Sequence, residues 1–131
     1  MAMSKLYPPV IEGILPAFYD TLKIPFIMNR SVAEDEYIGI SISIKDSVSG
    51  SLKKTYKVYK DSEKEDNDGK IKNHIVIINN IDKSAEYVIG MFYKIQIAYI
   101  SLNDEIGYYS TIGTAKCTGE AEINVLDLIK D

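Results

Sequence analysis

The acidic residues 66–68 come closest to a pattern for metal binding. In "DNDG", two aspartates and an asparagine stand before Gly69, and short oxygen ligands before a glycine suit a calcium-binding loop. Counted back from Gly69 with the EF-hand spacing, however, the first ligand position falls on Lys64, and a cationic side chain cannot coordinate a cation. Asp68-Gly69 is also a common turn dipeptide. The pattern therefore predicts a turn and no metal site.

The other side chains that could do chemistry stand alone. His74 is the only histidine, and without clustered ligands it favours a structural role at the start of an apolar strand. Cys117 is the only cysteine, so it cannot form an internal disulfide, and nothing near it suggests a nucleophile. Glu34, Asp35 and Glu36 are predicted to lie in a solvated loop, where neighbouring carboxylates rarely converge on one substrate bond. We predict no catalytic, cofactor or metal site and no enzyme.

Tyrosines carry more weight as binding residues, because their large amphipathic rings give contact area at low entropy cost. Tyr108 and Tyr109 are adjacent, so on a strand one points inward and the other outward. A role at a rim or in cross-strand packing is the competing interpretation. Three apolar residues of the C-terminal tail are the further candidates for partner contact, since termini gain by ordering against a neighbour. They are Ile123, Val125 and Leu128.

The elements that position these residues are predicted to be strands. In "IGISISIK", residues 38–45, isoleucines alternate with small or polar residues, which predicts one buried face and one face in water. In 22–28, Pro25 indicates an edge or irregular position because proline cannot donate to a ladder. The apolar run within 73–81 indicates a strand covered on much of both faces. Further strands are predicted at 52–60, 93–99 and about 107–117, and a solvated loop at 60–70.

Composition limits the classes of partner. The chain has 131 residues and a net charge of −4 without a basic block, which argues against binding nucleic acid or an anionic membrane surface. No segment approaches the ~20 apolar residues of a membrane span. Short strands without βαβ alternation favour an all-β sandwich of seven strands. We expect the sandwich to occupy residues 1–118 and residues 119–131 to form a tail or a linker to a further module.

The last third of the chain resembles a known domain family. "YKIQIAY" followed by "SLNDEIGYYS" is similar to the last two strands of a fibronectin type III domain, which implies an immunoglobulin-like antiparallel sandwich. By this resemblance Tyr93 is the corner tyrosine, whose hydroxyl bonds back to the preceding link, and Gly107 and Ser110 match the return strand. The tryptophan common in the family's second strand is missing, and Phe26 is expected in its space.

A second resemblance spans nearly the whole chain. "LYPPVIEGILPAF", "LKIPFIMNRSV", "GISISIKD" and "FYKIQIAYISLNDEIGYYSTIGTAKCT" together look like the amino-terminal module of tail-associated minor structural proteins of bacteriophages and prophages. This implies a noncatalytic virion component, made in the host cytoplasm, whose partners are other virion proteins in multiple symmetric copies. The alternative is a module that binds a glycan or protein of the host surface. An accessory domain of a secreted carbohydrate-active enzyme is less favoured, because no signal peptide is evident.

Overall fold

The computed structural model describes residues 5–13, 21–46, 52–79 and 92–116. Within them lie eight strands and one short 3-10 helix, η1 (Glu34–Glu36). The strands are β1 (Val10–Ile11), β2 (Thr21–Ile27), β3 (Tyr37–Asp46), β4 (Leu52–Tyr59), β5 (Gly69–Lys72), β6 (Ile75–Asn79), β7 (Phe92–Ser101) and β8 (Gly113–Lys116). They form two four-stranded antiparallel sheets, with strand orders β1-β2-β6-β5 and β4-β3-β7-β8.

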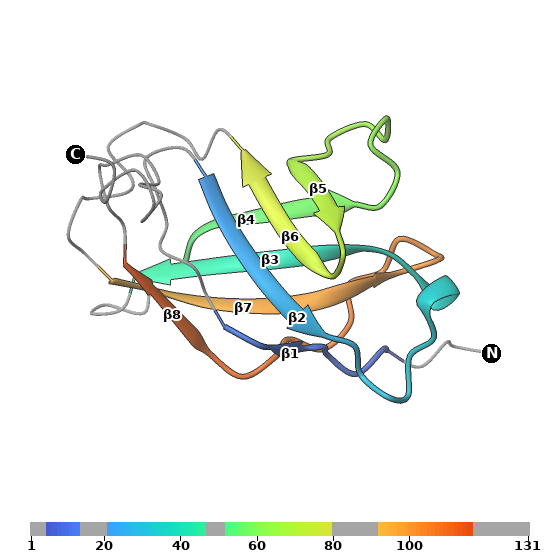
Figure 1. Ribbon diagram of the computed structural model, residues 1–131, viewed down its shortest axis with the longest axis horizontal. Helices are drawn as coiled ribbons and strands as arrows, with labels where there is room; N and C mark the ends of the chain where they lie inside the picture. Colours follow the sequence, from blue (N-terminus) through green and yellow to red (C-terminus); the bar gives the residue numbers. More distant parts are fainter. Residues whose placement is uncertain (1–4, 14–20, 47–51, 80–91, 117–131) are drawn as a thin grey trace, which may run out of the picture.

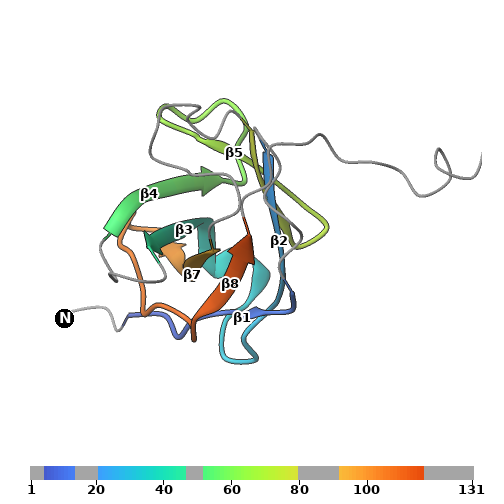
Figure 2. The same ribbon diagram turned by 90° about the vertical axis from the view of Figure 1, so that its left-hand side faces the viewer.

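The two sheets stack as the layers of a sandwich (Figures 1 and 2). Seven of the strands have four or more residues, and β1 has two. The prediction of an all-β antiparallel sandwich is therefore confirmed. Each layer is built from strands far apart in sequence, since β2 pairs with β6 and β3 pairs with β7.

The core lies between the layers and comes from alternate residues of each strand. Side chains on a strand point to opposite faces in turn, so every second β-branched or aromatic residue is available for burial. Phe26, expected in the place of a tryptophan, is buried here, and the rings of Tyr37 and Tyr99 pack with centroids 4.8 Å apart. The strand residues of the core are Leu22, Ile24, Phe26, Tyr37, Ile40, Ile42, Ile44, Tyr56, Val58, Val76, Ile78, Tyr93, Ile95, Ile97 and Tyr99.

Most of the second face of β3 is also buried, and there the prediction of a face in water is wrong, although Lys45 on the same face is partly exposed. Gly39, Ser41 and Ser43 are all buried, although Ser41 and Ser43 are polar. One reason is that the Tyr109 hydroxyl reaches Ser41 and lies 3.0 Å from its Oγ. Another is that Tyr59 of β4 lies against Gly39, where an added Cβ would stand 3.1 Å from its ring. Small residues on β3 thus make room for tyrosines from other elements.

Pro25 occupies an irregular position, as predicted, although its strand is not at an edge. Strand β2 lies between β1 and β6. The amide of Phe26 donates to the His74 carbonyl on the β6 side, so the missing N–H of Pro25 faces β1. That neighbour pairs only with Phe26 and Ile27, so little of a ladder is lost.

The segment between β4 and β5 differs in detail from the predicted turn. Gly69 begins β5, and the left-handed residue is Asp66, at φ 59°. Asp68 and Asn67 turn back toward β4, where their side chains accept hydrogen bonds from the amides of Lys57 and Tyr59 at 2.8 and 3.1 Å. These short polar side chains therefore hold the end of the loop against the sheet instead of facing a cation.

The predicted return strand is regular only near its end. Strand β8 pairs with β7 over Gly113–Lys116, whereas earlier the chain follows β7 through single bonds from Gly107 to Tyr99 and from Ser110 to Ile97. Tyr93 is buried at the start of β7. Its expected bond to the preceding link, Cys117 and the 118/119 boundary involve residues outside the described part of the chain.

Candidate interaction surface

The outer face of the β1-β2-β6-β5 sheet carries several large apolar side chains, with Lys23 of β2 and two lysines of β5 among them. On β2, Leu22, Ile24 and Phe26 are buried, so the residues between them point outward. These outward residues include Pro25 and Ile27. On β6, burial of the intervening Val76 and Ile78 directs two further isoleucines to the same outer face, Ile75 and Ile77.

The strand register brings these residues together. Pro25 lies opposite Ile75, Lys23 opposite Ile77, and Ile27 opposite Val10 of β1. Neighbours across strands are ~5 Å apart, close enough for their side chains to touch. We refer to the five apolar residues as the apolar strip: Val10, Pro25, Ile27, Ile75 and Ile77. Val10 and Ile27 are 54% and 53% exposed, and the other three are partly exposed.

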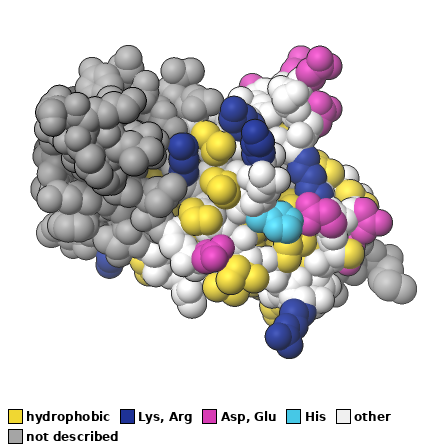
Figure 3. All heavy atoms as spheres, viewed as in Figure 1, with side chains coloured by type: hydrophobic (Ala, Val, Ile, Leu, Met, Phe, Trp, Pro, Cys, Tyr) yellow, Lys and Arg dark blue, Asp and Glu magenta, His cyan; other side chains and the backbone are white. Residues whose placement is uncertain are grey.

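Charged residues border the apolar strip on both sides (Figure 3). On β5, Lys70 lies opposite Ile77 and Lys72 opposite Ile75. On the other side, the Glu12 amide donates to the Pro25 carbonyl at 2.9 Å, which places Glu12 beside Pro25. One row across the sheet therefore reads Lys72, Ile75, Pro25, Glu12, with opposite charges at its two ends.

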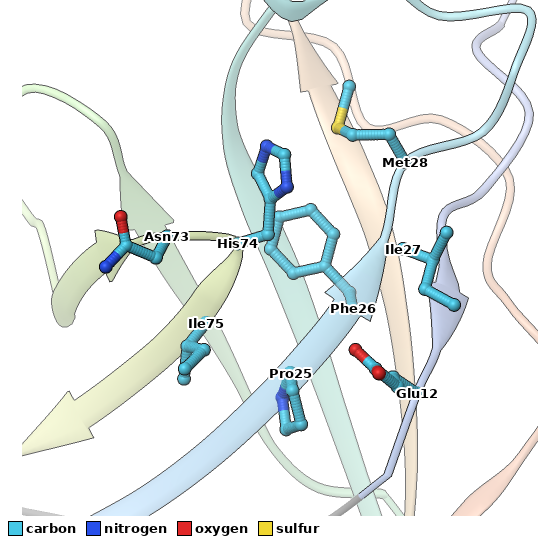
Figure 4. Close-up of a pocket in the computed structure, with 8 residues that line it drawn as sticks. All are labelled: Glu12, Pro25, Phe26, Ile27, Met28, Asn73, His74 and Ile75. Atoms are coloured by element: carbon cyan, nitrogen blue, oxygen red, sulfur yellow. The ribbon is translucent and has the colours of Figure 1, made fainter.

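A hollow lies at the end of the strip nearest the β5–β6 turn (Figure 4). The rings of His74 and Phe26 lie side by side in it, with centroids 5.4 Å apart, and Glu12 and Ile27 lie on the β1 side. More of its lining is apolar than polar. The lining residues are Glu12, Pro25, Phe26, Ile27, Met28, Asn73, His74 and Ile75.

The β5–β6 turn holds His74 in an uncommon backbone conformation. Asn73 and His74 have φ values of 52° and 58°, and they form the two-residue connection between paired Lys72 and Ile75. Positive φ at both central residues is the pattern of a type I′ hairpin turn, which favours asparagine at the first position and glycine at the second. A histidine in glycine's place costs about 1 kcal/mol or more, so neighbouring contacts must fix it there.

Glu34 supplies one such contact. Its Oε2 lies 3.0 Å from His74 Nε2, its Oε1 accepts a hydrogen bond from the Tyr37 hydroxyl at 3.1 Å, and Lys60 Nζ lies 3.7 Å from Oε1. Partial burial acts to raise the pKa of Glu34, but the bonds from His74 and Tyr37 and the charge of Lys60 lower it on balance. Glu34 is exposed, as predicted, but it lies in a 3-10 helix and its side chain also ties η1 to the β5–β6 turn.

Tyr37 contacts both Glu34 and Lys60. Burial, the negative charge of Glu34 and the hydrogen bond to it raise the pKa of the Tyr37 phenol, so the hydroxyl stays a hydrogen-bond donor. Lys60 Nζ lies 3.6 Å from the centre of the Tyr37 ring and also donates to the Glu34 carbonyl oxygen. The contacts join residues from η1, β3, the end of β4 and the β5–β6 turn, so they stabilise the corner where the two sheets meet.

The two tyrosines predicted as partner contacts lie elsewhere and play different parts. Tyr108 is 50% exposed and stacks on Tyr7, with ring centroids 5.7 Å apart and planes 25° apart. Lys5 Nζ lies 5.4 Å from the Tyr108 ring centre. Tyr109 is 37% exposed but its hydroxyl is bound to Ser41. We call Lys5, Tyr7 and Tyr108 the tyrosine patch. The other predicted contacts, Ile123, Val125 and Leu128, lie outside the described residues.

The strip and the tyrosine patch offer apolar contact area and charged groups to a partner. Among the described residues, no group of three or more His, Cys, Asp or Glu side chains is placed to hold a metal ion, and no helix there has the length and apolar character to cross a membrane. The strip was missed from the sequence because its residues come from three strands. A signal existed in "HIVIIN", where apolar residues fill both faces, although the outward isoleucines prove to be only partly covered.

Comparison with known proteins concerns the fold. A solved structure described as "Myokine structure" has a TM-score of 0.54 and 12% identity, and the match covers 91% of this chain and 100% of that one. The fourth FNIII domain of a human protein has a TM-score of 0.51 and 12% identity, with 95% and 91% covered. No protein-family model and no curated protein sequence matches the chain.

These neighbours support a fibronectin III-like module. The chain has that fold. One fold serves many functions, so the fold by itself names no partner. The resemblance to bacteriophage tail proteins has no counterpart among these neighbours and stays a prediction.

Proposed function

We propose that the protein is a noncatalytic docking module of a bacteriophage particle, in the tail or another appendage, made in the host cytoplasm and carried in the virion. The observation that supports a docking role is the apolar strip, with its five contiguous side chains on the outside of a sheet. The assignment to a phage rests on the sequence resemblance. Neighbouring virion proteins, present in symmetric copies, are the proposed partners.

The physical reason is the free energy gained by covering the strip. Removing apolar surface from water is worth ~25 cal/mol per Å². Val10 and Ile27, the two half-exposed residues of the strip, therefore each contribute roughly 1 kcal/mol when they are covered. The charged borders contribute little to affinity and fix which way the partner lies. A rigid sheet loses almost no conformational entropy on binding, which suits repeated assembly into a particle.

The second candidate is a module that binds a host-surface glycan or protein. The tyrosine patch favours it, because Tyr7 and Tyr108 present half-exposed rings side by side with the ammonium of Lys5. Aromatic rings beside a donor suit a sugar ring or a peptide. Replacing both rings by Tyr7→Ser and Tyr108→Ser would lower adsorption to cells and leave particle composition unchanged in this case.

Two isoleucines of equal exposure allow a matched test of docking. Ile27 lies in the apolar strip and is 53% exposed, whereas Ile112 lies outside it and is 54% exposed. Particles from the organism that carries the gene would be purified and quantified by mass spectrometry. We expect Ile27→Lys to reduce incorporation tenfold or more and Ile112→Lys to leave it unchanged. Absence of the wild-type protein from particles would refute the virion assignment, and equal incorporation of both variants would refute the strip as the docking surface.

A further inference from the structure

We propose that the apolar strip packs against the same strip of a second copy of this chain, across a two-fold axis that lies between β6 and β2 and runs parallel to them. This proposal rests on the proposed docking role of the strip and identifies the partner that covers it. A two-fold interface is self-complementary, so each residue and its counterpart exchange roles across the axis. The charges at the two ends of one row of this sheet meet that condition.

The row Lys72, Ile75, Pro25, Glu12 carries the charge complementarity. Its residues come from β5, β6, β2 and β1 in that order. An axis between β6 and β2 exchanges β5 with β1 and β6 with β2. Lys72 then faces Glu12 of the second copy, and Ile75 faces Pro25 of the second copy, each contact occurring twice.

The next row of the sheet fits the same arrangement. Ile27 of β2 lies opposite the position on β6 that is taken by the β5–β6 turn, and the hollow beside His74 is found there. Phe26, Met28 and Ile75 contribute apolar lining to it. The most exposed isoleucine of the strip, Ile27, therefore lies over the apolar hollow of the other copy.

Charge also disfavours a two-fold axis that runs across the strands. An axis across the strands, along the same row, would place each residue opposite its own counterpart. Lys72 would then face Lys72 and Glu12 would face Glu12, and like charges brought together at an interface are strongly unfavourable. Apolar contact alone is compatible with both axes. The charges of Lys72 and Glu12 favour the axis parallel to the strands.

The size of the face predicts a weak dimer. Four strands ~4.8 Å apart, with three rows of outward side chains, cover roughly 400 Å² on each copy, whereas a standard interface buries about 800 Å² per partner. We therefore expect a reversible dimer with a dissociation constant on the order of 0.1 mM. In a particle, where copies are held close together, such an affinity is sufficient because the effective concentration reaches the millimolar range.

Sedimentation equilibrium on the purified full chain, from about 10 µM to 1 mM, tests the dimer. We expect the weight-average mass to rise from monomer toward dimer for the wild type and for Ile112→Lys. Ile27→Lys should weaken association at least tenfold. Circular dichroism and urea unfolding on each variant establish that the fold is retained.

A charge swap tests the arrangement. Lys72→Glu and Glu12→Lys should each weaken the dimer several-fold, because each places like charges together twice. The double variant should restore association to near the wild-type value. A double variant as weak as the singles would overturn the proposed axis, and a wild type that stays monomeric at 1 mM would overturn self-association. Such a monomer, combined with loss of Ile27→Lys from particles, would leave the docking role standing with a different virion protein as the partner.

Discussion

On the outer faces of both sheets, the exposure of the side chains is the opposite of what their polarity indicates. In the β4-β3-β7-β8 sheet, three outward residues of β3, Gly39, Ser41 and Ser43, are glycine or serine, and they are buried. In the β1-β2-β6-β5 sheet, the outward residues Ile27, Ile75 and Ile77 are apolar and remain partly or half exposed. Small polar side chains are thus covered on one sheet while large apolar ones are open on the other.

The difference comes from what crosses each face. On the β3 side, the chain after β7 brings Tyr109 across to Ser41, and β4 places Tyr59 over Gly39. The small residues are there because larger ones would collide with these rings. On the β2 side, no described residue takes the place of those tyrosines over Ile27 and Val10. We infer that residues of the same chain cover the outer face at β3, and that the outer face at β2 is available to a partner.

The largest expected effect on stability is at Gly39, on the outer face of β3, where the neighbouring strand leaves no room for a side chain. A Cβ built at this position would lie 2.5 Å from the Val58 carbonyl oxygen, and backbone cannot move aside as a side chain can. Gly39→Ala should therefore destabilise the protein by about 3 kcal/mol, measured by urea unfolding. Gly13→Ala is the control, since no heavy atom lies within 4 Å of its Cβ position. Equal stability of the two variants would contradict close packing on this face.

A smaller effect is expected where the closed face buries a polar group. Ser41 is fully buried and its Oγ lies 3.0 Å from the Tyr109 hydroxyl. Tyr109→Phe removes that partner and should cost about 1–2 kcal/mol in unfolding free energy, because a buried hydroxyl left without its bond keeps its desolvation penalty. Adding Ser41→Ala should recover part of the loss.

Tyr108→Phe is the control for this hydroxyl. Its ring stacks on Tyr7, and within the described residues its hydroxyl makes no hydrogen bond. Its unfolding free energy should change by less than about 0.5 kcal/mol. If Tyr108→Phe proved as damaging as Tyr109→Phe, the bond to Ser41 would not account for the loss.

The alternation of apolar and polar residues along the strands predicted correctly which residues form the core, but it did not predict which outward residues are covered. Ile40, Ile42 and Ile44 are buried as expected, because period-two patterning fixes which residues share a face. Whether the other face meets water depends on a segment more than sixty residues later in the chain, and the polarity of Ser41 gave no sign of it. The apolar run of β6 indicated a strand covered on much of both faces, and its outward residues Ile75 and Ile77 are indeed partly covered, but the run did not show which strands lie beside them.

The contact between Glu34 and His74 could not be predicted from the sequence either. The two residues are 40 positions apart, and each stands in a context with an ordinary explanation, one in an acidic turn and one at a strand end. They meet because η1 and the β5–β6 turn lie at the same corner of the sandwich (Figure 1). The positive φ of His74 is visible only in three dimensions, since neither hydropathy nor charge pattern encodes it.

The smallest expected effect concerns this corner, which borders the open face. The folded-state pKa of Glu34 is lowered, so its contribution to stability is present above the unfolded pKa of about 4.3 and is lost as pH falls through the lower folded value. Because the Glu34 side chain is 60% exposed, solvent screening limits the contribution to less than about 1 kcal/mol. Glu34→Gln should lower the urea midpoint at pH 7 and approach the wild type as the pH falls below the folded-state pKa of Glu34. Asp35→Asn changes a neighbouring carboxylate of η1 without touching His74 and should show a smaller loss at pH 7. Equal losses in the two variants would mean that the contact between Glu34 and His74 does not hold the turn, and that the outer face of the β1-β2-β6-β5 sheet does not depend on it.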